Sequence, residues 1–476
     1  MRSAIFFIAA LLLQPAARAA EKGKTPKPAP SRSFTLDGAI SVGLQQNPDI
    51  LKSVHEIERT RGQIIEVRAQ AIPRLAAASQ YNQLDPKLLE VQGGFQGGAG
   101  AGGGFVVLQD KSWRITFEAR QLVYAGGQVK AALKIAQLTE DTSHHLLRET
   151  VDRVVANIRT QFYTILLNRE LITVAEETIQ LLTDELTDQQ NRFAAGTVPR
   201  FNVLRAEVEL ANARPTLIRA RNNHLISRLE LAKTLGFDAG QGVDSIGELR
   251  AIPREFSLAR ALAAARERRA LLKAQKNTIS SEEEQIKLAA AGYKPRMEVS
   301  AGYELRNSRL TQDLTQETNG WYIGATGSWN IFDGLETKGK IDQAKARVAS
   351  AKVSFADSVQ QVELEVQKAF ARVNEARELI ESQGKVVEQA EEALRLAKER
   401  LAAGAGTQLD VLDTRVALTR ARTTEKQALF DYNVAIAELD RSTGAETIHD
   451  QTFPNPATAR SKAALRSGAT PLRPAD

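Results

Sequence analysis

Two carboxylates stand out among the residues that could do chemistry. Thr407 is followed three positions later by Asp410, and Asp413 lies a further three positions along. Thr407 with Asp410 is the pattern of a helix N-cap, in which side-chain oxygens accept hydrogen bonds from free backbone N–H groups. If three copies surrounded an axis, the two aspartates would instead supply six carboxylates that narrow a pore and favour cations. For Asp410, the sequence favours the cap and the gate equally. The position of Asp413, one turn inside the helix, favours a role in the gate.

Nothing else in the chain has the spacing of a catalytic or metal site. The five histidines are not arranged as metal ligands, no Ser/His/Asp set or carboxylate pair is placed for catalysis, and cysteine is absent. Without cysteine there are no disulfides and no thiolate ligands. The net charge is +6, but Lys and Arg are interleaved with Glu and Asp along the predicted helices, which indicates solvated faces. We therefore expect no enzyme, no cofactor, no metal and no nucleic-acid partner.

The helix that leads to the acidic segment has a seven-residue repeat. A strict heptad predicts a left-handed coiled coil. The glycines of Ala403-Gly-Ala-Gly406 then allow a reversal, so a long helix should turn back on itself at a small acidic tip. The repeat consists of Val359, Val366, Val373, Ile380, Val387, Leu394 and Leu401, with Val362, Ala369, Ala376, Gln383, Ala390 and Ala397 at the intermediate seam positions.

The same pattern occurs earlier in the chain. The heptad that begins at Val359 has a counterpart that begins at Val151, so the offset is 359 minus 151, or 208 positions. Between Arg192–Arg214 and Arg400–Arg422, 10 of 23 aligned residues are identical. The chain is therefore an internal duplication, with two long helical hairpins of one architecture.

Each repeat also contains segments in which apolar and polar residues alternate. Such segments cover 113–120 and, more weakly, 74–82 in the first repeat, and 296–306 and 321–331 in the second. Strands of about 10 residues with one apolar face are the pattern of a transmembrane barrel wall. A sheet edge cannot face lipid, and four strands are too few to close, so the barrel must be shared between chains. A soluble four-stranded sheet is the alternative, but helices about 100 Å long would leave it without a core to cover it.

The N-terminus has the pattern of a secretory signal peptide, with Arg2, an apolar run from Ala4 to Leu13 and a small-x-small site at Ala17-Arg-Ala19. The run is about half the length that spans a bilayer. We expect the chain to divide into a signal peptide (1–19), a flexible leader (20–33), a first repeat (34–235, with a β-hairpin at 74–123 and a helical hairpin at 128–235), a connector (236–256), a second repeat (257–444, with a β-hairpin at 296–332 and a helical hairpin at 335–443) and a disordered tail (445–476).

In this arrangement the chain resembles the outer-membrane efflux family of TolC-like channel-tunnel proteins. The resemblance rests on Leu36-Asp-Gly-Ala-Ile40 with Asn47-Pro48, the two Pro-Arg turns before the strands, the Ile-Phe-Asp-Gly334 turn and the repeated Ala-Ala-Gly tips. It implies an α+β membrane protein, in which three chains share a twelve-stranded outer-membrane barrel and a helical tunnel across the periplasm. It further implies a homotrimer, a periplasmic adaptor and an inner-membrane pump as partners.

The resemblance also implies that the aspartates of the Leu-Asp-Val-Leu-Asp motif line the periplasmic constriction, and Asp410 and Asp413 match them. Where the family's well-studied channel has a Tyr and an Arg that help to hold the closed state, this chain has Leu401 and Gly406. Any closing contact must therefore use other partners.

The first repeat carries Asn202 and Arg205 where the second has the two aspartates. We predict Arg200 or Arg205 as the partner of the gate, and an opening led by the acidic second hairpin. The tip glycines should act as helix C-caps. The small-residue tip, with Gly196, Thr197, Gly404 and Gly406, should also present a groove for an adaptor.

The leading hypothesis is thus a passive exit duct for small molecules, located in the outer membrane and gated at its periplasmic tip. The same type of duct could serve a type I protein secretion system, and one sequence does not separate the two. A periplasmic coiled-coil adaptor or scaffold without a pore is the alternative of another class. An adaptor ordinarily has one helical hairpin, so the two hairpins and four amphipathic strands count against it.

Overall fold

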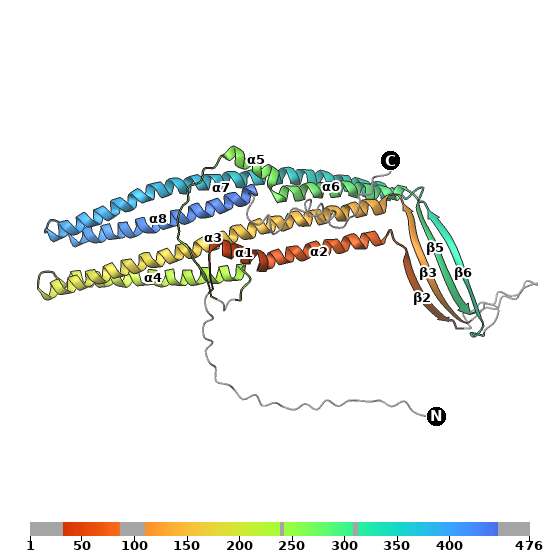
Figure 1. Cartoon of the computed structure of the whole chain (residues 1–476), viewed down its shortest axis with the longest axis horizontal. Coiled ribbons are helices and arrows are strands. Elements are labelled where there is room, and N and C mark those ends of the chain that lie inside the picture. Colours follow the sequence, from red (N-terminus) through yellow and green to blue (C-terminus); the bar gives the residue numbers. More distant parts are fainter. Residues whose placement is uncertain (1–31, 86–109, 239–241, 308–312, 446–476) are drawn as a thin grey trace, which may run out of the picture.

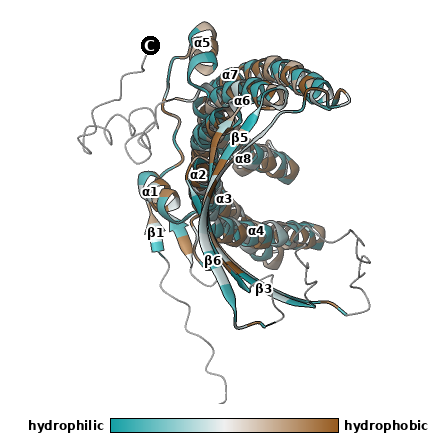
Figure 2. Ribbon diagram, turned by 90° about the vertical axis from the view of Figure 1, so that its right-hand side faces the viewer, coloured by the Kyte–Doolittle hydropathy of each residue, from teal (hydrophilic) through white to brown (hydrophobic). Residues whose placement is uncertain are grey.

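The computed structural model of the chain describes residues 32–85, 110–238, 242–307 and 313–445 (Figure 1). The predicted signal peptide, the leader up to residue 31, the Gly-rich run at 93–104 and the tail beyond 445 lie outside the described residues. The described chain is elongated, with the tips of two helical hairpins at one end and a curved sheet at the other (Figures 1 and 2).

Each repeat begins with two short helices separated by a single residue. In the first repeat that residue is Asn47, whose side chain accepts hydrogen bonds from the N–H groups of Asp49 and Ile50 and so caps the second helix. In the second repeat it is Arg269. The four helices are α1 (Leu36–Gln46), α2 (Pro48–Ala69), α5 (Leu258–Arg268) and α6 (Ala270–Ala290), and α6 runs on into a 3-10 turn, Ala291–Tyr293.

Two long helical hairpins are the largest elements of the described chain. The first joins α3 (Gln128–Ala194) to α4 (Arg200–Thr234), and the second joins α7 (Glu336–Ala402) to α8 (Gln408–Thr443). α3 and α7 have 67 residues each, or about 100 Å of helix. The predicted heptad is confirmed by burial, because its apolar positions form the inward stripe of α7: Val362, Val366, Ala369, Val373, Ala376, Leu394 and Ala397 are buried.

The strands of the two repeats form one antiparallel sheet, ordered β2-β3-β5-β6. β2 and β6 are its outer strands, so each has one edge with no partner in this chain. The last strand ends at Ser328, and Trp329 and Ile331, which alternation had placed in it, follow it instead. The strands are β2 (Arg74–Gln83), β3 (Lys111–Ala125), β5 (Arg296–Asn307) and β6 (Glu317–Ser328).

One face of this sheet is apolar and exposed. The register places Phe117 beside Tyr303 and Tyr303 beside Trp321, and the Trp321 side chain is 77% exposed. The opposite face carries ion pairs, including Arg120 with Glu118 at 2.8 Å. An exposed apolar face opposite a polar one is the predicted pattern of a barrel wall, with lipid outside and water inside.

The last two residues of the predicted leader, and part of the predicted connector, form regular structure. Arg32–Phe34 forms strand β1, which pairs in parallel with β4 (Val243–Ser245) in the connector. The ring of Phe34 stacks on Phe237 at 5.9 Å, and Val243 and Leu249 are buried. The prediction that the leader continues to residue 33 was therefore wrong, because this short segment gains a backbone partner that composition alone does not reveal.

The apolar core is divided between the repeats. One cluster joins α1 and α2 to α3 and the end of α4, and includes Ile158 and Leu231. A second joins α5 to α7 and α8, and includes Val366 and Tyr432. Among the residues described, none of the helices combines the length and the hydropathy that crossing a bilayer would require.

Candidate gate at the helical tips

Both helical hairpins reverse through the same turn. Gly196 and Gly404 each have a φ of +72°, the left-handed region in which a side chain is strained. The N–H groups of Thr197 and Ala405 donate to the carbonyls of Arg192 and Arg400 five residues earlier. The predicted C-cap role fits these two glycines.

Gly406 has another role. Its φ is not positive, so the interpretation of Gly406 as a C-cap was wrong. A Cβ at this position would lie 3.1 Å from the Arg400 Cβ and from the Leu401 nitrogen. A side chain here would be tightly packed, because the returning chain passes close to the end of α7.

Asp410 forms the predicted cap. Its N–H donates to the Thr407 hydroxyl at 3.2 Å, and its carboxylate accepts from the Thr407 N–H at 2.9 Å. These hydrogen bonds, with the nearby Arg400 charge, lower the pKa of Asp410. Asp413 is exposed one turn further along α8. Both carboxylates therefore lie at the tip, and Asp410 also has a structural role.

The two predicted arginine partners differ in position. Arg200 is exposed at the first residue of α4, whereas Arg205 is half-buried one turn later. Arg205 and Asp413 line the same cavity of about 400 Å³, which lies between the two hairpins. Neither arginine forms an ion pair among the described residues, so a closing contact through Arg205 remains a prediction.

The structure contains a contact between the hairpins that the sequence did not predict. Arg415 of α8 and Glu185 of α3 form an ion pair at 3.1 Å, and their side chains are only 13% and 9% exposed. Gln408 and Gln189 also donate hydrogen bonds to Glu185. We call these four residues the latch.

One signal for the latch was present in the heptad. Gln189 occupies the seam position that Ala397 occupies in the second repeat, and it is 1% exposed. A polar residue at a buried seam position indicates a specific partner. Glu185 and Arg415 lie outside the seam, so their pairing follows only from how the two hairpins pack.

Further polar contacts join α3 to α8 farther from the tip, and together with the latch they form a polar seam between the two hairpins. Arg422 of α8 binds Glu177 of α3 and Glu391 of α7, each at 2.8 Å. The hydroxyls of Thr178 and Thr419 lie 3.4 Å apart. By contrast, the apolar cluster near the tip, which includes Leu394 and Leu418, belongs to the second hairpin alone.

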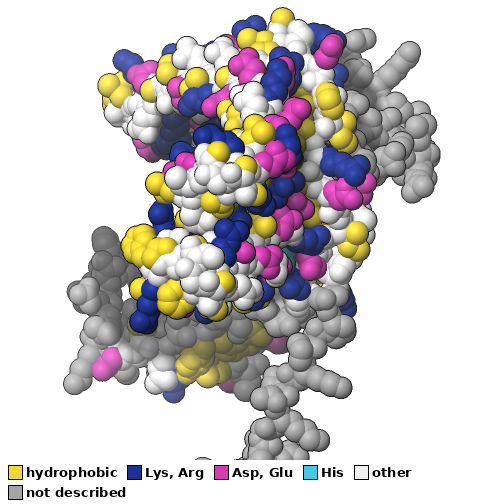
Figure 3. All heavy atoms as spheres, turned by 90° about the vertical axis from the view of Figure 1, so that its left-hand side faces the viewer, with side chains coloured by type: hydrophobic (Ala, Val, Ile, Leu, Met, Phe, Trp, Pro, Cys, Tyr) yellow, Lys and Arg dark blue, Asp and Glu magenta, His cyan; other side chains and the backbone are white. Residues whose placement is uncertain are grey.

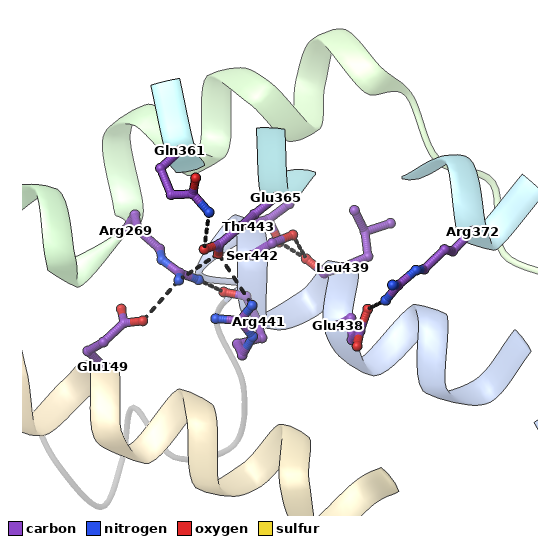
Figure 4. Close-up of polar contacts among 10 residues, drawn as sticks. All are labelled: Glu149, Arg269, Gln361, Glu365, Arg372, Glu438, Leu439, Arg441, Ser442 and Thr443. Atoms are coloured by element: carbon purple, nitrogen blue, oxygen red, sulfur yellow. Dashed lines mark hydrogen bonds and ion pairs between the residues drawn. The ribbon is translucent and has the colours of Figure 1, made fainter. Parts of the chain in front are cut away.

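A buried arginine anchors the other end of the second hairpin (Figure 4). Arg269, 2% exposed, binds Glu149 of α3 at 2.9 Å and Glu365 of α7 at 3.2 Å. It also donates to the backbone carbonyl of Arg441 in the last turn of α8. One side chain, at the start of α6, thus joins α3, α7 and α8. We call Arg269 and its three partners the anchor.

The anchor has a simpler counterpart in the first repeat. The Asn47 side chain donates to the carbonyl of Thr234, the last residue of α4, at 2.7 Å. Asn47 and Arg269 therefore occupy equivalent breaks between helices, and each satisfies the end of a return helix. Only Arg269 adds ion pairs that connect the second hairpin to the first repeat.

Asp152, close to the anchor, is buried beside Arg148 at 3.4 Å. Burial raises the pKa of Asp152 from 3.8 to about 6, against the attraction of Arg148. Because the folded pKa exceeds that of the unfolded chain, the stabilisation from this group is complete below pH 3.8 and is lost as the pH rises through about 6.

The fold and the tip together define a duct component, a chain with a strip of barrel wall at one end and a strip of helical tunnel at the other. The family model for outer membrane efflux proteins matches residues 39–237 and 261–445. The chain belongs to the outer membrane efflux protein family. It is an outer-membrane channel protein of the TolC-like type with its helical tunnel in the periplasm, and it is not an enzyme.

Known proteins are similar along most of the chain. Nodulation protein T of Rhizobium leguminosarum bv. trifolii is 22% identical over 415 residues, which cover 86% of this chain and 85% of that protein. Outer membrane protein OprJ of Pseudomonas aeruginosa is 23% identical over 397 residues, covering 81% and 79%. The solved CmeC outer membrane channel of Campylobacter jejuni has the same fold, with a TM-score of 0.75 and 13% identity over 93% of this chain and 98% of that one. Membership of the family decides against a scaffold without a pore.

Proposed function

We propose that three copies of this chain form the exit duct of a tripartite efflux system for small molecules, and that the duct opens when the second hairpin moves away from the first. Outer membrane efflux proteins form trimeric channels that work with an adaptor and an inner-membrane pump. The barrel carries cargo across the outer membrane, and the tip of the tunnel controls entry from the periplasm.

The polar seam between the hairpins is the observation that supports this opening. Near the tip, α3 and α8 meet through the latch, Arg422 and Thr419, whereas the second hairpin keeps its own apolar cluster. Polar groups that separate into water are hydrated again, but a separated apolar core is not. The cavity of about 400 Å³ between the hairpins also means that little close packing is lost.

The gate itself combines charge with this movement. Three copies would place Asp410 and Asp413 around the narrow end, and Arg205 faces the cavity that Asp413 lines. A ring of carboxylates at a constriction favours cations. Arg205 would draw Asp413 toward the first hairpin when the hairpins are together, which favours the closed state.

Replacing both aspartates by asparagine tests the gate. Asp410→Asn with Asp413→Asn should lower the cation-to-anion permeability ratio by roughly an order of magnitude at low salt, where charges are poorly screened. Asparagine can still accept the Thr407 N–H, so the cap is kept. The measurement is the reversal potential in planar bilayers, with Asp188→Asn of the exposed Asp188–Arg192 pair as control. An unchanged ratio in the double variant would remove both aspartates from the gate.

The tips also offer a surface for the adaptor (Figure 3). Gly196, Thr197 and Gly404 are exposed and Gly406 is half-buried, and large exposed apolar side chains lie within a few residues of them in the sequence. These side chains are Phe193, Phe201, Leu204 and Leu409, which are 45%, 67%, 48% and 44% exposed. Clustered exposed apolar residues mark an interaction site.

Because the chain has no cysteine, single cysteine residues introduced at the tip can be cross-linked specifically to the adaptor. Thr197→Cys and Ala405→Cys avoid the strained positions Gly196 and Gly404 and should cross-link in cells to one periplasmic protein. Leu229→Cys, exposed far from the tip on α4, is the control. Equal cross-linking from all three positions would place the adaptor elsewhere.

A further inference from the structure

A second cavity lies where the sheet meets the helices. It has a volume of about 500 Å³, and residues from β5, β6, α6 and the first turns of α7 line it. Two glycines allow the backbone to come close there. A Cβ on Gly126 would lie 2.7 Å from the Lys294 Cβ, and one on Gly292 would lie 2.6 Å from the Thr337 hydroxyl. The shape of the cavity therefore depends on the backbone as well as on side chains.

The lining of this cavity is strongly basic. The described residues that line it include Lys294, Arg296, Lys340 and Arg347, and none of them is acidic. Lys340 pairs with Glu336 at 2.5 Å, and Arg296 lies 3.9 Å from Glu298. Lys294 and Arg347 form no ion pair within the described part of the chain. Two cations are thus available to a ligand, and the neutral donors Gln128, Gln285, Ser328, Asn330 and Gln343 accompany them.

The cavity belongs to the water-filled side of the wall. Arg296 is paired with Ser328 in the sheet, and both line the cavity. Along β5, Arg296 shares its face with Glu298 and Glu304, whereas the exposed apolar face carries Met297 and Tyr303. Since the apolar face of a barrel wall meets lipid, the cavity opens to the interior of the duct.

We propose that this cavity is an anion-binding subsite, which holds a phosphate or carboxylate group of cargo on its way from the tunnel to the barrel. Guanidinium and ammonium groups bind such oxyanions, and amide and hydroxyl groups can complete the set of donors. Weak binding along a duct aids transport, because cargo must both enter the site and leave it. A trimer would have three such subsites on its inner wall.

Tripolyphosphate, a small multivalent anion, is the probe. The trimer, purified in an uncharged detergent, should bind about one tripolyphosphate per chain by calorimetry at low salt. Lys294→Gln with Arg347→Gln should weaken binding by about tenfold or more, because each charge pair near 4 Å contributes about fivefold even in water. Arg347→Lys keeps the charge and should keep most of the affinity.

Lys338→Gln with Lys345→Gln is the matched control, because these exposed lysines are on α7 but do not line the cavity. It should bind like the unchanged protein. Equal weakening in both double variants, or no binding by the unchanged protein, would overturn the proposal. A lipid headgroup has the same chemistry, so short-chain phosphatidylglycerol is titrated in the same way. It should bind at least tenfold more weakly than tripolyphosphate, because its phosphate carries a single charge. Comparable or tighter binding would indicate a lipid site and would also overturn the proposal.

Discussion

The Arg415→Met variant is expected to open the channel. Loss of the arginine leaves the Glu185 carboxylate without a cation while the hairpins are together, and the Glu185 side chain is only 9% exposed. Breaking one partner of a buried ion pair costs about 3–5 kcal/mol. Separation of the hairpins hydrates Glu185 again, so this cost falls on the closed state, and the population of open tips should rise by about two orders of magnitude or more.

The measurement is single-channel conductance in planar bilayers, with sensitivity of cells to a large antibiotic such as vancomycin as a second readout. Adding Glu185→Gln to Arg415→Met removes the stranded charge, and glutamine can keep its contacts with Gln189 and Gln408. The double variant should therefore return toward the conductance of the unchanged protein. Lys398→Met, on an exposed residue of α7 that does not line the cavity between the hairpins, is the control. Low conductance in the single variant would show that the latch does not hold the tip.

Arg269→Met should have the largest effect on assembly. The substitution leaves Glu149 without its arginine, leaves Arg441 as the remaining cation beside Glu365, and removes a donor from the Arg441 carbonyl. Loss of a buried charged partner of this kind costs about 3–5 kcal/mol. We expect less trimer in the outer membrane and faster trypsin digestion of the second hairpin, because that hairpin loses one of its buried ion-pair connections to the first repeat.

Arg266→Met is a matched control for this variant. Arg266 is three residues away and pairs with Glu363 at 2.8 Å, but its side chain is 61% exposed. An exposed pair of this kind contributes about 1 kcal/mol or less. If both variants assembled and resisted trypsin equally well, Arg269 would not anchor the hairpin.

The sequence predicts most of this fold because the elements repeat and have clear periods. The heptad of α7 and the alternation in β5 are local patterns, and the duplication supports each with a second copy. The offset is 208 for the heptad and 296 minus 74, or 222, for the strand. The pairing of Arg32–Phe34 with Val243–Ser245 was missed, because strands of three residues have no period to detect.

The candidate site was predictable only in part. Glycines and a Thr-x-x-Asp pattern locate the tip, since turns and caps are local. The latch and the anchor connect residues such as Glu185 and Arg415, which are 230 positions apart, and a single sequence carries no sign of such a pairing. The lone arginine between α5 and α6 gives no hint that it is buried among four helices.

The central claim is that the second hairpin moves away from the first, and a disulfide tests it most directly. The hydroxyls of Thr178 and Thr419 are 3.4 Å apart across the seam, and no native cysteine competes. Cysteines at both positions should form a disulfide that holds the tip closed. In the Arg415→Met background, which should otherwise conduct, we predict low conductance until a reductant is added. In the otherwise unchanged protein we predict drug-sensitive cells until a reductant is added, with Thr178→Cys alone behaving like its parent protein. Full conductance and efflux with the disulfide formed would contradict the account.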